Sequence, residues 1–431
     1  MQYLEPVAPA VYLEGIKNAS ELIKASKDCV IVAHNDADGI CSSLILEKAM
    51  ARAGVGPVNS YYVEKTFPGI IRYVYAHHPG SAVFFSDIGS ERMHDISKAV
   101  QDYGNRSVVI DHHRTHGVQP AIDRLINLNC EDFGIPAESN LSASTIAYLV
   151  ARAIDPGNSD LSYLAVIGSM DDFGTVSGLD KIAFADGFNI HNGNTRLIFF
   201  EGNYYEVGWS TPNAPQRTSE RAGVIGENIS CCSAMKFFAD DNLKDNGVLK
   251  RLKAGLEKRC FDSVTDSMIY GCWQQHDLKT DTIDKQLTRG GSGITLGEDF
   301  VYIHLPSITD TSKYSTKYAG LVADWIAANS CEANTALSDV IVVMVGQSCR
   351  TDLPMMGHIL PPDKLKISYR LTKRGAGVDL AQMVSTTKHK LGDVNHSAGS
   401  HTHKAAIAID NSQIENLIRI SQETLHNIRY S

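Results

Sequence analysis

The chain has 431 residues, of which 43% are hydrophobic and 21% are charged, so its composition excludes a disordered or fibrous protein and indicates two or three globular domains. The net charge of −9 argues against a protein that coats nucleic acid non-specifically, but it leaves open a nucleic-acid enzyme, because such binding depends on local charge. No apolar run approaches the roughly 20 residues that a membrane helix needs.

The compartment is predicted from the cysteines and the N-terminal residues. The nine cysteines contain no C-x-x-C pair, and several of them, such as Cys29 and Cys41, stand within apolar runs. We therefore expect reduced, mostly buried thiols. The first 20 residues include Glu5 and Glu14 and do not have the pattern of a signal peptide. These features predict a cytoplasmic protein without a membrane partner.

The first half of the chain alternates β-rich and helical patterns. Strands are predicted at 29–34, 81–89 and 106–113, and helices at 39–54, 140–157 and 161–174. Strand–helix–strand alternation indicates the α/β class, with a parallel sheet covered by helices.

The rest of the chain divides into a middle region and a second β/α region. The middle, 186–300, contains a basic amphipathic helix at 246–264 and a turn-rich connector at 287–300. From about residue 300 the β/α pattern returns, with strands predicted at 299–306, 338–347 and 364–372 and a helix at 318–330. We expect three parts: a domain at 1–185, an insert or linker region at 186–300, and a smaller α/β domain at 301–431.

Ionisable side chains follow the predicted strands of the first domain. The first strand is followed by "HNDADG", the second contains "SDIG", the third ends in "DHH", and a later apolar segment ends in "MDDF". Because the carboxyl ends of parallel strands share one edge of a sheet, we expect these residues to converge there. They are His34, Asp36, Asp38, Asp87, Asp111, His112, His113, Asp171 and Asp172.

A metal centre is the chemistry that this combination predicts. Several carboxylates at one edge would repel each other strongly unless cations neutralised them. Imidazole mixed with carboxylate suits Mn²⁺ better than Mg²⁺, although Mg²⁺ is not excluded. Two such ions about 3.5–4 Å apart, sharing one carboxylate, form a clamp for in-line attack on phosphorus.

The order of these motifs resembles the DHH phosphoesterase superfamily over residues 25–185. The resemblance implies a two-metal-dependent phosphodiesterase. His34, Asp36 and Asp87 would hold one ion, and Asp38, Asp87, His112 and Asp172 the second, with Asp87 as the bridge. The catalytic residues would be Asp38, His113, which faces the scissile phosphate, and Asp111, which supports the site. The choice between Asp171 and Asp172 stays open.

The C-terminal region resembles the domain that follows the DHH domain in exonucleases of this superfamily. "ISYRLT" places Ser368 and Arg370 as in the S-x-R strand of that domain. "HSAGSHTHKAAIAID" resembles its glycine-rich loop, but Ser400 replaces the second glycine, one residue is extra, and Ile407 stands where glycine is usual. The implied substrate-binding residues are Ser368, Arg370, Gly399, Ser400, His401 and His403, with His401 and His403 as alternatives. The active site is expected in the cleft between the two domains.

The charge of the stretch 361–405 is relevant to whether the protein binds phosphate groups of a substrate. This stretch contains eight lysines and arginines against three aspartates, a net charge of +5, and either binds phosphates or is a solvated basic face. The length of the chain and its two core domains are most similar to archaeal RecJ-like nucleases, which implies a single-strand-specific exonuclease on DNA or RNA in replication or repair.

Two alternatives have different consequences. A phosphodiesterase for short oligonucleotides or cyclic dinucleotides would act only on very short substrates. A scaffold associated with the replicative helicase would bind replication or repair proteins and would not bind metal. The complete ligand set argues against a scaffold without activity, although a protein partner remains compatible with an enzyme.

Overall fold

The computed structural model forms two compact units, which we call the N-terminal unit and the C-terminal unit. The N-terminal unit comprises Met1–Ser233, Lys244–Ile269 and Pro354–Met356, and the C-terminal unit comprises Ala234–Leu243, Tyr270–Leu353 and Gly357–Ser431. The predicted division at 1–185, 186–300 and 301–431 stays a prediction. The structure describes residues 8–113, 122–135, 141–189, 191–192, 195–201, 204–210, 219–238, 247–330, 337–350, 352–359, 364–392, 397–400 and 404–430.

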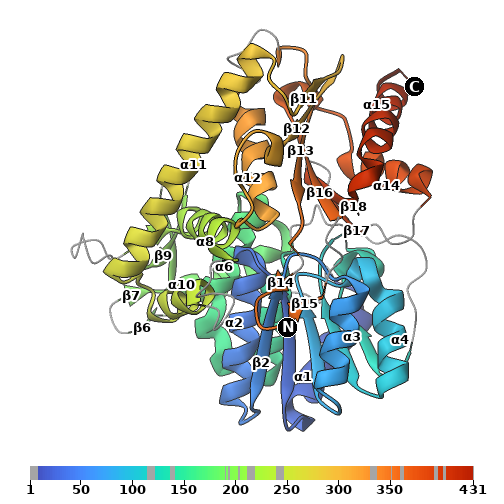
Figure 1. Cartoon of the computed structure of the whole chain (residues 1–431). Coiled ribbons are helices and arrows are strands. Elements are labelled where there is room, and N and C mark those ends of the chain that lie inside the picture. Colours follow the sequence, from blue (N-terminus) through green and yellow to red (C-terminus); the bar gives the residue numbers. More distant parts are fainter. Residues whose placement is uncertain are drawn as a thin grey trace. The chain divides into compact units, whose positions relative to one another are not determined.

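The N-terminal unit is built on a five-stranded, entirely parallel sheet with the order β2-β1-β3-β4-β5 (Figure 1). Its strands are β1 (Cys29–His34), β2 (Val58–Val63), β3 (Ala82–Ser86), β4 (Arg106–Ile110) and β5 (Leu125–Asn127). Every residue of β1 and β3 is buried, as expected for a parallel sheet covered on both faces. The predicted α/β class with a parallel sheet is therefore confirmed.

Two sets of helices pack on this sheet. One set comprises α1 (Ala10–Ala25), α2 (Ala37–Arg52), α5 (Ala143–Ile154) and α6 (Ser162–Phe173), which contact one another. The other set is α3 (Pro68–His77) and α4 (Met93–Tyr103), which pack together (Figure 1). The unit also contains α7 (Lys181–Asn189), α10 (Gly247–Lys258) and the short strands β6 (His191–Asn192), β7 (Thr195–Arg196), β8 (Ile198–Glu201), β9 (Tyr204–Gly208) and β10 (Ser219–Arg221).

The predicted strands and the observed ones differ at their carboxyl ends. The strands expected at 81–89 and 106–113 end at Ser86 and Ile110, three residues earlier than predicted. Asp87 and Asp111 are consequently the first residues after β3 and β4. The polar ends of both segments belong to the turns at the edge of the sheet and not to its hydrogen-bonded ladder.

The region 222–289 is largely helical. It contains α8 (Ala222–Lys236), α10 and the 27-residue α11 (Ser263–Arg289). The helix predicted at 246–264 ends at Lys258, because Arg259 adopts a left-handed backbone with φ 51°. The sequence pattern did not reveal α11, since its buried stripe is narrow and includes polar residues: Ile269, Cys272, His276, Thr280, Ile283 and Leu287. Among the described residues no helix is both long and apolar enough to span a membrane.

The C-terminal unit contains a mixed six-stranded sheet with the order β11-β12-β13-β16-β18-β17. Its strands are β11 (Ile294–Leu296), β12 (Phe300–His304), β13 (Val342–Ser348), β16 (Lys364–Leu371), β17 (Ser397–Ser400) and β18 (Lys404–Asp410), and β14 (Asp352–Leu353) pairs separately with β15 (Gly357–His358). Its helices are α12 (Lys317–Trp325), α14 (Leu380–Leu391) and α15 (Ile414–Tyr430).

Alternation along β16 separates an apolar face from a polar one. Ile367 and Tyr369 belong to the core that includes residues of α14 and α15. Ser368 and Arg370 point to the opposite face, where Gly320 of α12 lies close to both side chains. The sheet therefore presents the predicted S-x-R residues on its α12 face.

A partly buried ion pair attaches α10 to α2 and gives a prediction about stability. The Lys253 ammonium donates to both carboxylate oxygens of Glu47, at 2.6 and 2.5 Å, and each side chain is about one-fifth exposed. Lys253→Ala would leave the Glu47 charge without this partner, so we expect the free energy of unfolding in urea to fall by about 2 kcal/mol. Lys250→Ala, at an exposed position of the same helix, should change it by less than about 0.5 kcal/mol. Equal losses for both variants would contradict the role of the ion pair.

Candidate metal centre

The turn from β1 to α2 positions the first three site residues. His34 is the last residue of β1, Asp36 is the N-cap of α2, and Asp38 lies in the first turn of α2. The Asp36 carboxylate accepts a hydrogen bond from the Gly39 N–H at 3.1 Å. A side chain at position 39 would collide with the backbone carbonyl of His34, so glycine permits this tight return of the chain. The helix N-terminus favours both carboxylates through its dipole.

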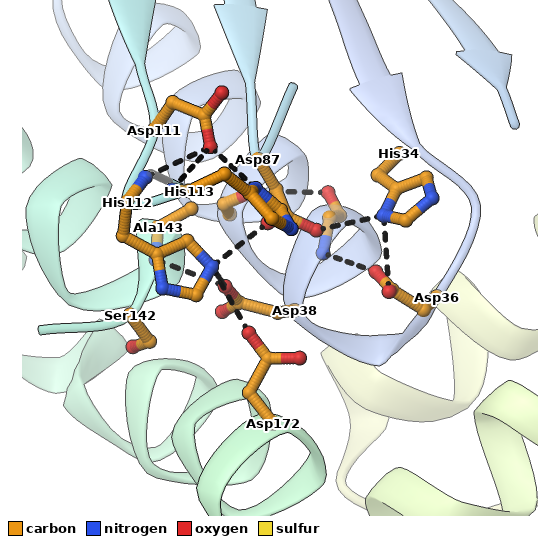
Figure 2. A network of polar contacts seen from close by, with 12 residues as sticks. His34, Asp36, Asp38, Asp87, Asp111, His112, His113, Ser142, Ala143 and Asp172 are labelled. Atoms are coloured by element: carbon orange, nitrogen blue, oxygen red, sulfur yellow. Dashed lines mark hydrogen bonds and ion pairs between the residues drawn. The ribbon is translucent and has the colours of Figure 1, made fainter. Parts of the chain in front are cut away.

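Asp87 lies between two groups of side chains (Figure 2). It directly follows β3 in a left-handed backbone conformation, φ 60°, that is uncommon for a residue with a side chain. Its N–H donates to the Ile110 carbonyl at 2.8 Å, which fixes the turn. Its Oδ2 is 3.1 Å from Nδ1 of His34, and its Oδ1 is 3.2 Å from Nε2 of His112. The two oxygens of one buried carboxylate thus face two different histidines.

The first group consists of His34, Asp36 and Asp87. Nδ1 of His34 lies 3.0 Å from Oδ2 of Asp36 and 3.1 Å from Oδ2 of Asp87, and all three residues are buried. One ligand atom from each residue falls within 4.8 Å of the others, so this group has the size of a metal site.

The second group consists of Asp38, Asp87, His112 and Asp172. Nε2 of His112 is 3.0 Å from Asp172, 3.2 Å from Asp87 and 3.7 Å from Asp38 (Figure 2). This group also has its ligand atoms within 4.8 Å of one another. The neighbouring Asp171 instead accepts hydrogen bonds from the Ser230 hydroxyl at 3.0 and 2.9 Å, although it also lies near Asp36 and Asp172.

Asp111 and His113 form a pair beside the second group. Nδ1 of His113 is 2.7 Å from Oδ1 of Asp111, and Asp111 also accepts backbone N–H groups of Ser90 and His112 at 2.9 and 2.8 Å. Burial by itself would raise the pKa of Asp111, but the charge and hydrogen bond of His113 and the other donors lower it below its usual value. An ionised Asp111 accepts the His113 Nδ1–H and so fixes the orientation of that ring.

The pKa values of the site residues are shifted because several buried carboxylates lie close together. Burial and the charge of Asp172 raise the pKa of Asp38 to about 7. Burial and the charges of Asp36 and Asp38 raise the pKa of Asp87. Burial would lower the pKa of His112, but its hydrogen bonds to Asp172 and Asp87 raise it well above its usual value. Like charges in a dry environment are therefore balanced here by protons, and divalent cations would balance them equally.

Backbone donors from α5 hold Asp38. The Ala143 and Ser144 N–H groups donate to its two carboxylate oxygens, both at 2.9 Å. Gly168 of α6 packs directly against this pair, because a Cβ at that position would lie 2.5 Å from Oδ1 of Asp38. Asp38 is therefore enclosed between the N-terminal end of α5 and the middle of α6, both of which follow it by more than 100 residues in the sequence.

The donor set fits divalent first-row ions. Each group combines imidazole nitrogen with carboxylate oxygen, the mixture that suits Mn²⁺. Asp87 belongs to both groups, as expected for a carboxylate that serves two adjacent ions. The ligand assignments remain proposals, and the geometry favours Asp172 over Asp171 beside His112.

The predicted substrate-binding residues lie in the C-terminal unit. Ser368 is buried, and Arg370 donates from Nε to Asp324 at 2.6 Å and from Nη1 to the Tyr369 carbonyl at 2.9 Å. Gly399 and Ser400 lie in β17, opposite Ala406 and Ala405 of β18. His401 and His403 lie outside the described residues.

Two contributors to the centre were not predicted from the sequence. The N-terminal end of α5 supplies donors to Asp38, and Asn129 donates to the Ser90 hydroxyl and the His113 carbonyl, both at 2.7 Å. The sequence predicts a helix at 140–157, but it does not show that the first N–H groups of this helix contact Asp38. Nothing in the local pattern around Asn129 indicates its role.

Comparisons with known proteins bear on the family and the fold. Residues 28–168 match the family model for the DHH family, N-terminal domain. An uncharacterised protein of Methanocaldococcus jannaschii is 27% identical over 187 residues, and this match spans 39% of the chain and 40% of that relative.

Two solved structures share the fold. One is a DHH domain of a protein described as a member of a family of ribosomal proteins, with TM-score 0.61 and 16% identity over 97% of this chain and 92% of that one. The other is exonuclease RecJ bound to manganese, with TM-score 0.56 and 12% identity over 95% of this chain and 94% of that one. At these identities the similarity concerns the fold alone.

The crowded carboxylates predict an unusual pH dependence of the metal-free protein. An acid whose pKa is raised by folding binds its proton more tightly in the folded state, so Asp38 and Asp87 reduce stability as pH rises above ~4, the ordinary range of a carboxyl group. His112, whose pKa is raised by folding, stabilises the folded state fully below pH ~6.5, and this stabilisation is lost as pH rises through its higher folded-state pKa. The lowered pKa of Asp111 stabilises the folded state, and this stabilisation is lost only below pH ~4, so it does not differ between pH 5.5 and pH 8. We therefore expect a lower melting temperature at pH 8 than at pH 5.5.

Thermal unfolding in a chelator, and with Mn²⁺ added, checks this expectation. Mn²⁺ should restore stability most at pH 8, where the ligands are deprotonated. Asp87→Asn should flatten the pH dependence and abolish most of the Mn²⁺ effect. Asp102→Asn, which removes an exposed acid on α4, should leave both unchanged. A metal-free protein that gains stability between pH 5.5 and pH 8 would contradict the prediction.

Proposed function

We propose that the chain is a metal-dependent hydrolase, namely a two-metal phosphodiesterase that removes nucleotides from single-stranded DNA or RNA. The match of residues 28–168 to the DHH family, N-terminal domain, supports this proposal. The preferred ion is Mn²⁺, with Mg²⁺ as the alternative. The proposed setting is cytoplasmic, in DNA replication or repair, where a protein partner from these processes is compatible with the activity.

The observation that carries this proposal is the position of Asp87. Its two oxygens lie 3.1 and 3.2 Å from histidines of two separate ligand groups, so one carboxylate can serve both ions. His34 and Asp36 would complete the first site, and Asp38, His112 and Asp172 the second. A pair of ions bound here supplies Lewis-acid chemistry, which neutralises charge on phosphoryl oxygens and makes water more acidic.

The side chains around the ligands have separate tasks in this reaction. Asp111 fixes the His113 ring through Nδ1, so that Nε2 can donate to a phosphate oxygen when the ring is protonated. Asn129 holds the backbone of His113 through its carbonyl. The N–H groups of Ala143 and Ser144 orient Asp38 so that its carboxylate can serve as a ligand of the second ion.

The proposed substrate contact in the C-terminal unit rests on a group of cations. Arg370 and Lys404 are directly opposite each other on β16 and β18. Burial would raise the pKa of Asp324, but the charges of Arg370, Lys404 and Lys317 lower it. Three cations around one carboxylate leave a positive surface, as phosphate binding requires. Arg370 suits a phosphate because its guanidinium can donate two parallel hydrogen bonds.

Hydrolysis should depend on the shared carboxylate. With end-labelled single-stranded DNA and RNA and Mn²⁺, we expect Asp87→Asn to lower kcat by about 10³-fold or more, because neither ion keeps its full ligand set. EDTA should abolish activity, and Asp102→Asn should match the wild type. Stepwise shortening of long strands supports the exonuclease. Cleavage confined to dimers through pentamers would indicate an oligonucleotide phosphodiesterase, and no hydrolysis by the wild type with either ion would contradict the proposed reaction.

Substrate affinity should depend on the cations of the C-terminal unit. We expect Arg370→Ala and Lys404→Ala each to weaken binding of a long single strand in EDTA and to reduce the slope of log K against log salt by ~0.7 for each lost phosphate contact. Arg374→Ala is the matched control, because Arg374 lies in the same basic stretch but is exposed and is not one of the three cations around Asp324. Unchanged affinity and salt slope in the first two variants would mean that this region is only a solvated basic face.

A further inference from the structure

Asp180 is a buried carboxylate that has no place in the predicted ligand set. It ends the short 3-10 helix Gly178–Asp180 between α6 and α7 and is 1% exposed. Its Oδ1 accepts the N–H and the hydroxyl of Ser142, both at 3.1 Å, and its Oδ2 accepts the Ser169 hydroxyl at 2.5 Å. Burial raises the pKa of Asp180 to about 6, although the hydroxyl and N–H donors lower it.

The two serines belong to the two helices that enclose Asp38. Ser142 is the N-cap of α5, and the next two N–H groups of that helix are the donors to Asp38 (Figure 2). Ser169 follows Gly168, which packs against the Asp38 carboxylate without room for a Cβ. Asp172 lies three residues further along the same helix.

We propose that Asp180 is a positioning residue of the metal centre, which joins the N-terminal end of α5 to α6 and so sets the orientation of Asp38 and Asp172. The inference rests on the proposed function, because it assigns these two carboxylates to one ion. Removal of the link should act on the ion held by Asp38, His112 and Asp172. It should spare the ion held by His34 and Asp36, which depends on the turn from β1 to α2.

The chain offers a matched control in Asp186. This residue of α7 accepts a hydrogen bond from the Tyr148 hydroxyl at 2.6 Å and forms an ion pair with Arg152. Both partners lie on α5, so Asp186 also attaches a neighbouring segment to this helix. Its contacts are at least four residues beyond the N–H groups that hold Asp38. Asp186→Ala therefore shows what a general weakening of the contacts of α5 does when the hydrogen bonds of Asp180 are left intact.

The experiment is a Mn²⁺ titration of the full chain by calorimetry and by electron paramagnetic resonance, beside thermal unfolding of the metal-free protein. For Asp180→Ala we expect the affinity for one ion to fall by ~10–100-fold, as when a residue behind a metal ligand is lost. The other affinity should stay within about threefold, and the signal of two coupled Mn²⁺ ions should disappear. Asp180→Asn should retain both ions, because its amide oxygen can accept from Ser142 and its NH2 can donate to the hydroxyl oxygen of Ser169. Asp186→Ala should lower the melting temperature but keep both affinities and the coupled signal.

The outcomes separate the two proposals. Unchanged affinities in Asp180→Ala, or an equal loss in Asp186→Ala, would overturn the positioning role. If Asp180→Ala does not fold, Ser169→Ala decides, since it removes only the link to α6: a weaker second ion supports the inference and unchanged binding overturns it. A wild type that binds fewer than two ions would contradict the metal centre and the inference together. A wild type that binds two ions and hydrolyses no phosphodiester would contradict only the proposed reaction.

Discussion

The constraint on which the rest of the N-terminal unit depends is the repulsion among carboxylates held at one edge of a parallel sheet. Asp87 is at its centre, because one oxygen faces His34 and the other faces His112. Its left-handed backbone conformation is maintained by a hydrogen bond to the neighbouring strand and by the packing of two buried strands. Such strained residues persist only where the surrounding structure fixes them, and they concentrate at functional sites.

Two of the ligand candidates, Asp36 and Asp38, are held in place by helix ends. Asp36 caps α2, and Asp38 accepts the first N–H groups of α5, so both negative charges lie where helix dipoles are positive. Gly39 and Gly168 allow the close approach that this arrangement needs. The site is therefore pre-organised by backbone groups, and its side chains have few alternative positions.

The two units differ in the charge that they present. The N-terminal unit concentrates carboxylates and three histidines around Asp87, whereas in the C-terminal unit Arg370, Lys404 and Lys317 lie around Asp324. The proposed function would use both features: the carboxylates and histidines would hold cations at the reacting phosphate, and the positive side chains would contact other phosphates of the strand.

The sequence by itself determined the α/β class, the three central strands and the convergence of His34, Asp36, Asp38, Asp87 and His112, because residues that follow parallel strands must share one edge of the sheet. It also predicted the alternation of β16 that places Ser368 and Arg370 on one face. These conclusions need only local patterns of apolar and polar residues and one rule of sheet geometry.

Only the tertiary structure decided what surrounds these residues. The distances that distinguish Asp172 from Asp171, the hydrogen bonds from α5 to Asp38 and the link through Asp180 all join segments far apart in the sequence. None of them leaves a periodic signal, since a single backbone N–H or a buried serine looks the same in any helix cap. The long helix α11 escaped detection for a related reason, because its buried stripe contains His276 and Thr280, which only packing identifies as interior residues.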